Sequence, residues 1–215
     1  MANLYGPRII TDGLVLHLDA GNRKSYPGSG NTWYDLSGNN NNGTLINGPV
    51  HNSSNGGVFL LDGVDDYIEI TLNLSTQNHT IFGAARYVSI GGRTFSGRLN
   101  NWLMGHWSSS TVKYYASGWV TDTNAGEQSD TNWRLYTAVG NYSSDQWTFY
   151  VNGSIDTGPN SGGVNGPNGF RIGRYGPTSG EYSNSHISFL TCYNRVLSTQ
   201  EIQQNYNALK GRFGL

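Results

Sequence analysis

The amino-acid sequence predicts an all-β protein: a two-sheet antiparallel jelly-roll sandwich with one short helix at its C-terminus. Three observations carry this prediction. Glycine, asparagine, serine and threonine make up 94 of the 215 residues, which favours turns and strands over helices. Aromatic residues reach 13%, enough to build a buried core. Short strand-like segments also recur at a spacing of roughly 8 to 12 residues, which is typical of sandwiches.

The first three predicted strands lie in the N-terminal third of the chain. In residues 14–19 a leucine occupies every second position, the pattern of a strand with one buried face. Residues 58–61 and 67–70 are predicted to form a hairpin-like pair around the turn at Asp62-Gly63. In the second of these segments two isoleucines alternate with Tyr67 and Glu69, so one face is expected in the core.

The clearest strand covers residues 147–151, because it alternates and then runs into Asn152-Gly153, a dipeptide that suits a type I′ turn. Further strands are expected at residues 80–88, 113–119, 133–142, 170–173 and 187–193. The segments between are too polar for a core and are predicted as loops: residues 22–32, 37–44, 51–57, 108–111, 121–131 and 157–169.

One helix is predicted, close to the C-terminus. Ser198 and Glu201 have the spacing of a capping box, and Leu197 and Ile202 occupy the positions of a hydrophobic staple around it. Gly211 is predicted to end the helix. With this helix, residues 13–215 are expected to form a single domain, preceded by an N-terminal arm of residues 1–12 that could lie on a neighbouring protein.

Charge and composition exclude several classes of protein. The chain has 13 basic and 14 acidic residues, whereas a nucleic-acid clamp needs a basic stripe. Its apolar runs are far shorter than the roughly 18 residues of a membrane span, and its start lacks the pattern of a secretory signal. Cys192 is the sole cysteine, so no intrachain disulfide can form. We therefore expect a protein made in the cytoplasm without a nucleic-acid or membrane partner.

Four stretches, in this order, resemble the concanavalin A-like lectin and glucanase superfamily, in particular its laminin G-like jelly-roll modules. They are residues 13–20 (GLVLHLDA), 33–38 (WYDLSG) with 42–44 (NGT), 61–68 (LDGVDDYI) and 187–202, around YNRVLS. The opening, through residues 19–22 (DAGN), 25–28 (SYPG) and 33–35 (WYD), is similar to such modules in structural proteins of tailed bacteriophages, notably those of cyanobacterial hosts.

The resemblance implies two antiparallel sheets packed face to face, with residues 14–19 beside residues 187–193. It also implies a role in glycan or protein contact, in some members with a calcium ion on the rim.

Carboxylates do not form the pattern that glycan cleavage needs. The glucanases of this superfamily carry a Glu-x-Asp-x-x-Glu run, and none of the four glutamates here begins one. The nearest cluster is Asp62, Asp65, Asp66 and Glu69, and its first three members fall in a turn, so we interpret them first as side chains that cap it. Calcium is the alternative, because hard oxygen ligands clustered in a loop suit that ion. No other cofactor is expected, and the chain is predicted not to be an enzyme.

Aromatic residues in loops are the remaining candidates for ligand binding. Such rings can stack on sugars or anchor a protein interface, whereas buried ones fill the core. The candidates are Trp33, Tyr34, Trp102 and Trp107, with Trp119 and Trp133 open to both interpretations.

The function predicted from these observations is that of a non-enzymatic virion protein of a phage, decorating the capsid or associated with the tail or neck. It would act by attachment, with a coat or tail protein or a host surface glycan as its partner. The alternative is a calcium-assisted adhesin that binds host surface polysaccharide. A glycan-degrading enzyme is disfavoured by the missing carboxylate run.

Overall fold

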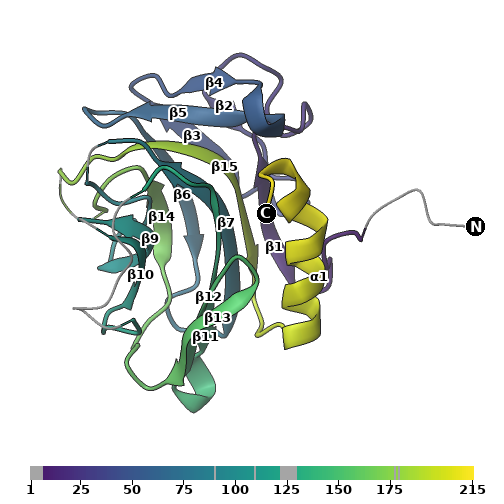
Figure 1. Ribbon diagram of the computed structural model, residues 1–215, viewed down its shortest axis with the longest axis vertical. Helices are drawn as coiled ribbons and strands as arrows, with labels where there is room; N and C mark the ends of the chain where they lie inside the picture. Colours follow the sequence, from purple (N-terminus) through teal and green to yellow (C-terminus); the bar gives the residue numbers. More distant parts are fainter. Residues whose placement is uncertain (1–6, 90, 109, 122–129, 177, 179) are drawn as a thin grey trace, which may run out of the picture.

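The computed structural model describes residues 7–89, 91–108, 110–121, 130–176, 178 and 180–215. Within these residues the strands form two antiparallel sheets packed face to face, and the α-helix lies outside one of them (Figure 1). The predicted fold class, an all-β jelly-roll sandwich with a short C-terminal helix, is confirmed.

The first sheet has eight strands and carries the helix. The predicted neighbourhood of residues 14–19 and 187–193 is confirmed, since Leu18 lies opposite Leu190. Asn152 and Gly153 both adopt positive φ angles, 50° and 77°, as a type I′ turn requires. The strand order is β13 (Ser154–Asn160), β12 (Gln146–Val151), β11 (Arg134–Asn141), β7 (His79–Tyr87), β15 (Asn184–Tyr193), β5 (Val58–Asp62) and β4 (Val50–Asn52), with β1 (Leu14–Asp19) also paired to β15.

The second sheet has seven strands, and its outer face carries no helix. Ile68 and Ile70 point into the core while Tyr67 and Glu69 point outward, which confirms the predicted alternation. The strand order is β10 (Ser110–Ala116), β9 (Trp102–Trp107), β8 (Phe95–Gly97), β14 (Asn168–Ile172), β6 (Tyr67–Asn73), β3 (Gly43–Ile46) and β2 (Thr32–Trp33).

Aromatic side chains fill the space between the sheets. Trp33 packs edge-on against Phe59 with ring centroids 5.0 Å apart, and Trp102 packs edge-on against Phe170 at 5.9 Å. Trp147 is also buried, as its alternation predicts. Each such ring removes a large apolar area from water, so this layer is the main source of hydrophobic stabilisation.

Helix α1 (Thr199–Leu209) covers a second apolar cluster on the outer face of the eight-stranded sheet. The predicted capping box is present: Glu201 N donates to Ser198 Oγ, and Ser198 N donates to the Glu201 carboxylate. Ile202 and Leu209 are buried against the sheet. The α-helix ends at Leu209 with Lys210 as its C-cap, next to the predicted stop at Gly211, and a 3-10 turn, Lys210–Arg212, continues from it.

The described part of the predicted N-terminal arm binds its own domain. Ile10 N donates to Asn205 Oδ1 on the helix at 2.8 Å, and the Tyr193 hydroxyl donates to Ile10 O. Asp12 forms an ion pair with Arg195. Residues 7–12 therefore do not reach away toward a neighbour, while residues 1–6 lie outside the described residues.

The predicted hairpin at residues 58–61 and 67–70 is wrong. Strand β5 pairs with β4 and β15 in the first sheet, whereas β6 pairs with β3 and β14 in the second. The turn between them, which contains Asp62, Asp65 and Asp66, crosses from one sheet to the other. Two alternating segments joined by a short turn look alike in sequence whether they pair or separate, so the pattern alone could not distinguish them.

Several strands do not appear among the predicted ones. Strands β4 and β13 lie within or beside segments predicted as loops, because they are short edge strands rich in polar residues. Strands β8 and β9 carry no clear period of two, since both of their faces are covered and nearly all of their residues are buried.

A buried histidine makes stability depend on pH. His79 is fully buried and its Nδ1–H donates to Gln77 O, while desolvation lowers its pKa from 6.5 to about 4. The unfolded chain binds this proton near pH 6.5, so stability is complete above that value and falls as the pH drops from 6.5 to about 4. We expect a loss on the order of 3 kcal/mol from this group.

Urea unfolding of the wild type and of His79→Gln at a series of pH values measures the effect. The variant should lose stability less steeply between pH 6.5 and 4, with a remaining slope from His186, whose pKa burial also lowers to about 4. Parallel curves for the two proteins would contradict the assignment.

Candidate functional site

A shallow pocket of about 200 Å³ lies at the edge of the seven-stranded sheet, on its outer face. Strand β9 places Trp102 and Met104 in the core, so Leu103 and Trp107 point outward. The same alternation on β10 sends Tyr114 inward and Tyr115 outward. We call this site the aromatic pocket; it is lined by Arg93, Asn101, Leu103, Trp107, Tyr115 and Trp119.

One carboxylate organises the polar side of the aromatic pocket. Glu181 Oε2 accepts from Arg93 Nε at 2.6 Å and from Trp107 Nε1 at 2.9 Å. Arg93 Nη1 donates to Asn101 Oδ1 at 2.7 Å. The guanidinium also lies 4.2 Å from the ring centre of Tyr175, a cation–π contact. These contacts hold Arg93 and Trp107 in one arrangement before any ligand arrives.

Three aromatic rings form the other side. The ring centroids of Trp107 and Trp119 are 5.5 Å apart, and those of Tyr115 and Trp119 are 5.0 Å apart in an edge-on contact. All three side chains are half-buried, so they keep part of their surface open to a ligand. An apolar wall beside a few oriented polar groups is the usual composition of a small-molecule site.

Polar groups that have no partner among the described residues remain at this site. They are Nη2 of Arg93, Oε1 of Glu181 and Nδ2 of Asn101. Two nitrogens and a carboxylate oxygen can donate to and accept from the hydroxyl groups of one ligand. The arrangement is suited to holding a flat, hydroxyl-rich molecule.

The structure separates the four aromatic candidates of the sequence. Trp107 lies in the aromatic pocket. Tyr34 is 46% exposed but follows β2, at the opposite edge of the sheet. Trp33 and Trp102 are fully buried, so the prediction that they bind a ligand is wrong: their rings fill the core and present no face to solvent. For Trp119 and Trp133 the sequence allowed either a core or a binding role. Trp119 lies beside Trp107 in the aromatic pocket, whereas Trp133 is buried.

The sequence prediction missed Arg93, Asn101, Tyr115 and Glu181. Arg93 and Glu181 are 88 positions apart, and no local spacing connects them. Tyr115 could have been found, because it alternates with the core residue Tyr114 on a predicted strand.

The aspartate cluster caps a turn, as its first interpretation predicts. Asp62 Oδ1 accepts from Val64 N at 2.8 Å, and these backbone hydrogen bonds lower the pKa of Asp62. Asp66 is 5% exposed, and burial together with the charges of Asp62 and Asp65 raises its pKa. Asp62, Asp65 and Asp66 can bring one oxygen each within 4.8 Å of one another. The donor set fits calcium in kind, but the ion would need further backbone or water oxygens, since it takes six to eight ligands.

Calcium binding at this cluster stays a prediction, and thermal unfolding tests it. If the ion binds, calcium at about 100 times its Kd should raise Tm by roughly 5 to 10 °C over a chelated sample. Asp66→Asn should abolish the rise, whereas the exposed Asp156→Asn should retain it. Equal Tm values with calcium and with chelator would show that the cluster does not bind calcium.

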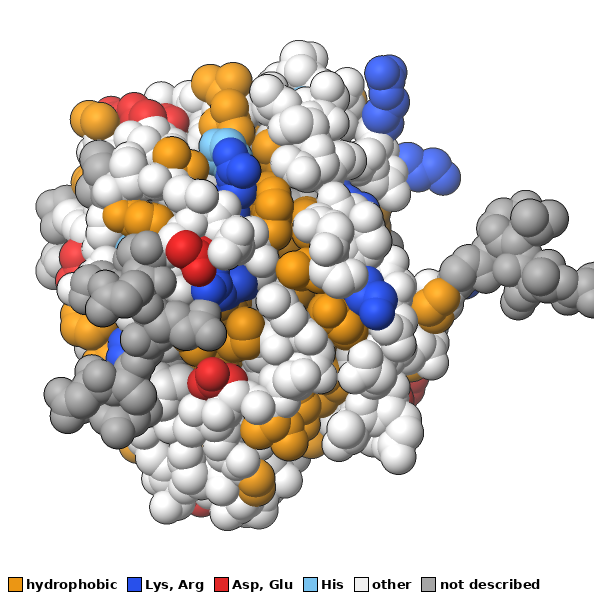
Figure 2. All heavy atoms as spheres, in the orientation of Figure 1, with side chains coloured by type: hydrophobic (Ala, Val, Ile, Leu, Met, Phe, Trp, Pro, Cys, Tyr) orange, Lys and Arg blue, Asp and Glu red, His pale blue; other side chains and the backbone are white. Residues whose placement is uncertain are grey.

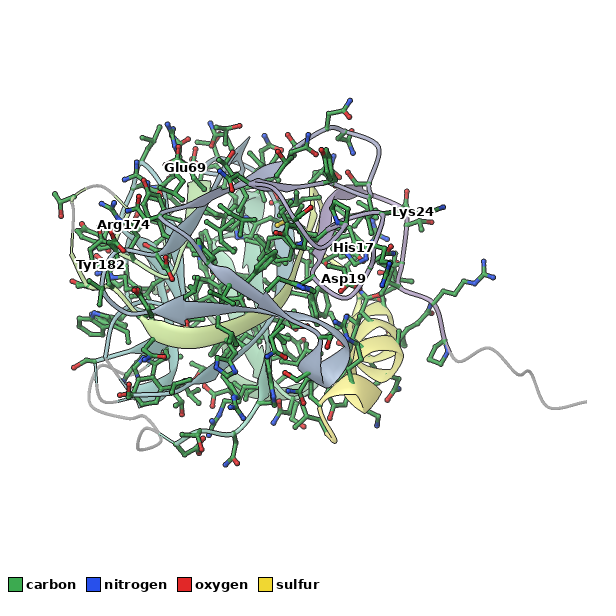
Figure 3. All side chains as sticks on the ribbon, turned by 90° about the horizontal axis from the view of Figure 1, so that it is seen from above. His17, Asp19, Lys24, Glu69, Arg174 and Tyr182 are labelled. Carbon is green, nitrogen blue, oxygen red and sulfur yellow. The ribbon has the colours of Figure 1, made fainter. Side chains whose placement is uncertain are left out.

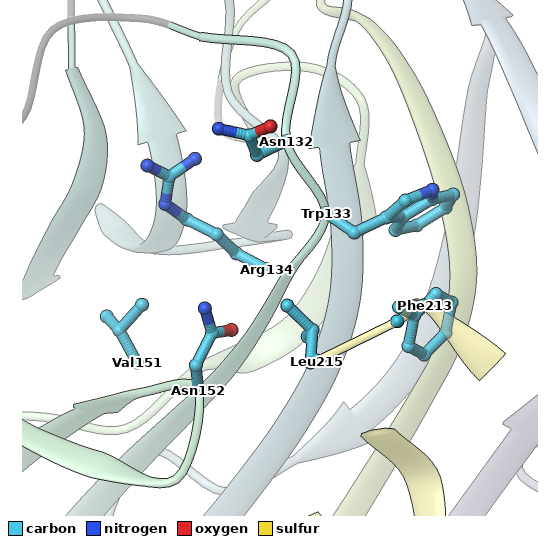
Figure 4. Close-up of a pocket in the computed structure, with 8 residues that line it drawn as sticks. Asn132, Trp133, Arg134, Val151, Asn152, Phe213 and Leu215 are labelled. Atoms are coloured by element: carbon cyan, nitrogen blue, oxygen red, sulfur yellow. The ribbon is translucent and has the colours of Figure 1, made fainter. Parts of the chain in front are cut away.

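A larger cavity of about 430 Å³ lies beside the last residues of the chain (Figure 4). Its two aromatic residues already contact each other, since the ring centroids of Trp133 and Phe213 are 4.8 Å apart. Its cation, Arg134, is held by both oxygens of Asp130 at 2.7 and 2.8 Å, and this pair lowers the pKa of Asp130 to about 2. Its groups are thus largely engaged with one another.

In the part of the chain that the structure describes, the face drawn in Figure 2 has no stripe of basic side chains of the kind that binds nucleic acid. Figure 2 shows lysine and arginine side chains distributed singly over the visible face rather than gathered into a stripe. Among the described residues, no helix is long and apolar enough to span a membrane.

Comparisons with known proteins identify the fold. No family model matches the chain, and no curated protein matches it by sequence. The binding domain of Paraclostridial Mosquitocidal Protein 1 is similar in structure, with a TM-score of 0.65 and 16% identity over 92% of this chain and 52% of that one.

Two further solved structures are similar. Domain 4 of AbnA, a GH43 extracellular arabinanase from Geobacillus stearothermophilus, in complex with arabinotriose, has a TM-score of 0.67 and 17% identity over 90% of this chain and 98% of that one. Trypanosoma rangeli sialidase in complex with sialic acid has a TM-score of 0.66 and 12% identity over 96% of this chain and 35% of that one. The chain thus spans about half of the toxin domain and a third of the sialidase. These likenesses confirm the jelly-roll sandwich fold.

Proposed function

We propose that this chain is a carbohydrate-binding module that holds a glycan in the aromatic pocket and does not cleave it. The observation that carries the proposal is that Glu181 accepts hydrogen bonds from both Arg93 and Trp107, which places polar groups beside an aromatic wall.

A sugar ring matches this wall in two ways. Its C–H faces are apolar and can lie against Trp107, Tyr115 or Trp119, while its hydroxyl groups point outward in the plane of the ring. Arg93 Nη2, Glu181 Oε1 and Asn101 Nδ2 are the unpartnered groups that can receive those hydroxyls. Because intramolecular contacts already orient them, little conformational entropy is lost on binding.

The structural neighbours support a glycan as the ligand. One is an arabinanase domain in complex with arabinotriose, and another is a sialidase in complex with sialic acid. We carry over only the class of ligand, because the identities are 17% and 12%.

The proposal that the chain does not cleave glycans rests on the carboxylates around the pocket. Canonical glycosidases place two carboxyl groups across the scissile bond. Among the described residues of the seven-stranded sheet's outer face, Glu181 is bound to Arg93 and Glu69 is bound to both Arg98 and Arg171. Both carboxylates are thus engaged by arginine side chains, an arrangement that suits binding better than proton donation.

The finer assignment, attachment to a phage virion, stays a prediction that depends on the motifs at residues 19–35. In that setting the coat or tail protein would hold the module and the aromatic pocket would face a host glycan. Mass spectrometry of purified virions tests this assignment, and finding the chain only in infected-cell lysate would count against it.

Variants of two exposed aromatic residues test the glycan proposal. An array that includes arabino-oligosaccharides and sialyl-oligosaccharides should identify a bound glycan, and calorimetric titration should then give its Kd. Trp107→Ala should weaken binding about tenfold or more, because it removes the stacking wall and one ligand of Glu181. Tyr34→Ala, at the opposite edge of the sheet, is the matched control and should bind as the wild type does.

If the glycan still binds to Trp107→Ala but not to Tyr34→Ala, the binding site lies near Tyr34 and not in the aromatic pocket. If no glycan on the array binds, the proposal is wrong. Loss of binding with a chelator would favour the calcium-assisted adhesin. The same mixtures should release no reducing sugar; release that Glu181→Gln or Asp66→Asn abolishes would show an enzyme instead.

A further inference from the structure

A second cleft, of about 440 Å³, lies far from the aromatic pocket. It is formed by the segment after β1, residues 20–28, and by residues 51–57, which run from β4 to the start of β5. In Figure 3, Lys24 marks the first segment, while Tyr182, which follows Glu181 of the aromatic pocket, lies on the other side of the molecule. We call this site the β1–β4 cleft.

The cleft is a preformed feature, because two glycines lock its walls together. A Cβ on Gly57 would lie 2.3 Å from Gly21 Cα, and one on Gly21 would overlap Gly56 O. The two segments can approach this closely only with glycine at these positions. Arg212 also ties them, since it forms an ion pair with Asp19 and donates to Gly56 O.

Two rings line the cleft. Tyr26 and His51 lie with their centroids 5.0 Å apart, and both rest on Phe59 in the core, at 4.9 and 5.6 Å. His51 Nε2 is bonded to Ala20 O, and because a carbonyl oxygen only accepts, this nitrogen carries the hydrogen. Nδ1 of His51 is then left as an acceptor with no partner among the described residues. Tyr26 is only 7% exposed and supports the cleft from the core side, so the half-buried His51 and the exposed Pro27 supply most of its flat, partly apolar wall.

The charge of the cleft is positive. Arg23 lines it, is exposed, and has no ion pair or hydrogen bond of its side chain among the described residues. No aspartate or glutamate lines the cleft, and the adjacent Asp19 is already paired with Arg212. An unpaired guanidinium beside a cavity is suited to a carboxylate, which it can bind through two parallel N–H donors.

We propose that the β1–β4 cleft is a second binding site, which takes a sugar unit that carries a carboxylate. Arg23 binds the carboxylate, the wall formed by His51 and Pro27 contacts the ring, and His51 Nδ1 accepts from a hydroxyl group. The volume lies within the range of roughly 300 to 1,000 Å³ that small-molecule sites occupy. This proposal does not depend on the aromatic pocket, and with both sites occupied the chain would hold two points of an acidic polysaccharide.

Titration with glucuronate, followed by NMR of the ¹⁵N-labelled full chain, tests the proposal. The amides of Gly21, Gly28, Gly56 and Gly57 line the cleft and report on binding there. Glucuronate should shift them in a saturable way, whereas glucose and acetate should each bind about tenfold more weakly or worse, because each lacks one half of the recognition.

Variants then assign the effect to named residues. Arg23→Ala should weaken glucuronate binding about tenfold, while Lys24→Ala, a neighbouring exposed cation outside the lining, should leave it unchanged. Trp107→Ala should also leave it unchanged, which separates this site from the aromatic pocket. Tm values of the variants would confirm that each is folded.

Three results would overturn the proposal. If glucose binds with the same Kd as glucuronate, the charge of Arg23 is not used in recognition. If acetate binds with the same Kd as glucuronate, the cleft does not recognise a sugar. Equal weakening by Arg23→Ala and Lys24→Ala would show general attraction of an anion to surface charge.

Discussion

The packing of aromatic side chains between the two sheets is the constraint on which the rest of the structure depends. A strand alternates its side chains, so each ring that enters the core determines which neighbours face outward. On β9, the buried Trp102 obliges Leu103 and Trp107 to lie on the outer face of the sheet, where Leu103 is itself covered, and on β10 the buried Tyr114 does the same for Tyr115. The core therefore builds the aromatic pocket indirectly. It also explains why Trp33 and Trp102 cannot bind a ligand: they are the residues that hold the sheets together.

Arginine side chains hold the loops against the outer face of the seven-stranded sheet through ion pairs and cation–π contacts. Arg93 pairs with Glu181 and lies against Tyr175, while Arg174 lies against Tyr67 and Tyr182 with its guanidinium carbon 4.8 and 5.3 Å from the ring centres. Arg93 and Arg174 are buried beneath their partners, so their charges are screened less than those of exposed arginines. In place of an external helix, a layer of cations and aromatic rings covers the sheet, and the pocket is an opening at its edge.

The similar structures show how the same sandwich serves different proteins. A toxin binding domain, an arabinanase domain and a sialidase share it with this chain at 12–17% identity. Such a fold needs inward apolar residues and turn residues between strands, and it leaves the outward positions and edge loops free to vary. Most residues that line the aromatic pocket and the β1–β4 cleft occupy such positions, whereas Tyr26 and Leu103 are buried.

The sequence by itself determined the class of fold, most of the longer strands, the capping box at Ser198 and the turn at Asn152-Gly153, because these follow from periodicity and from local backbone preferences. It could not determine that β5 and β6 belong to different sheets, nor which tryptophans other than Trp147 are buried, because pairing partners are chosen by contacts between distant strands. The same holds for the site. Trp107 and Trp119 could be named as candidates, but Arg93 and Glu181 meet only when loops 88 positions apart are brought together over one sheet. Only the tertiary structure decides such contacts, because they form only once the intervening chain has been closed into a loop, which costs conformational entropy.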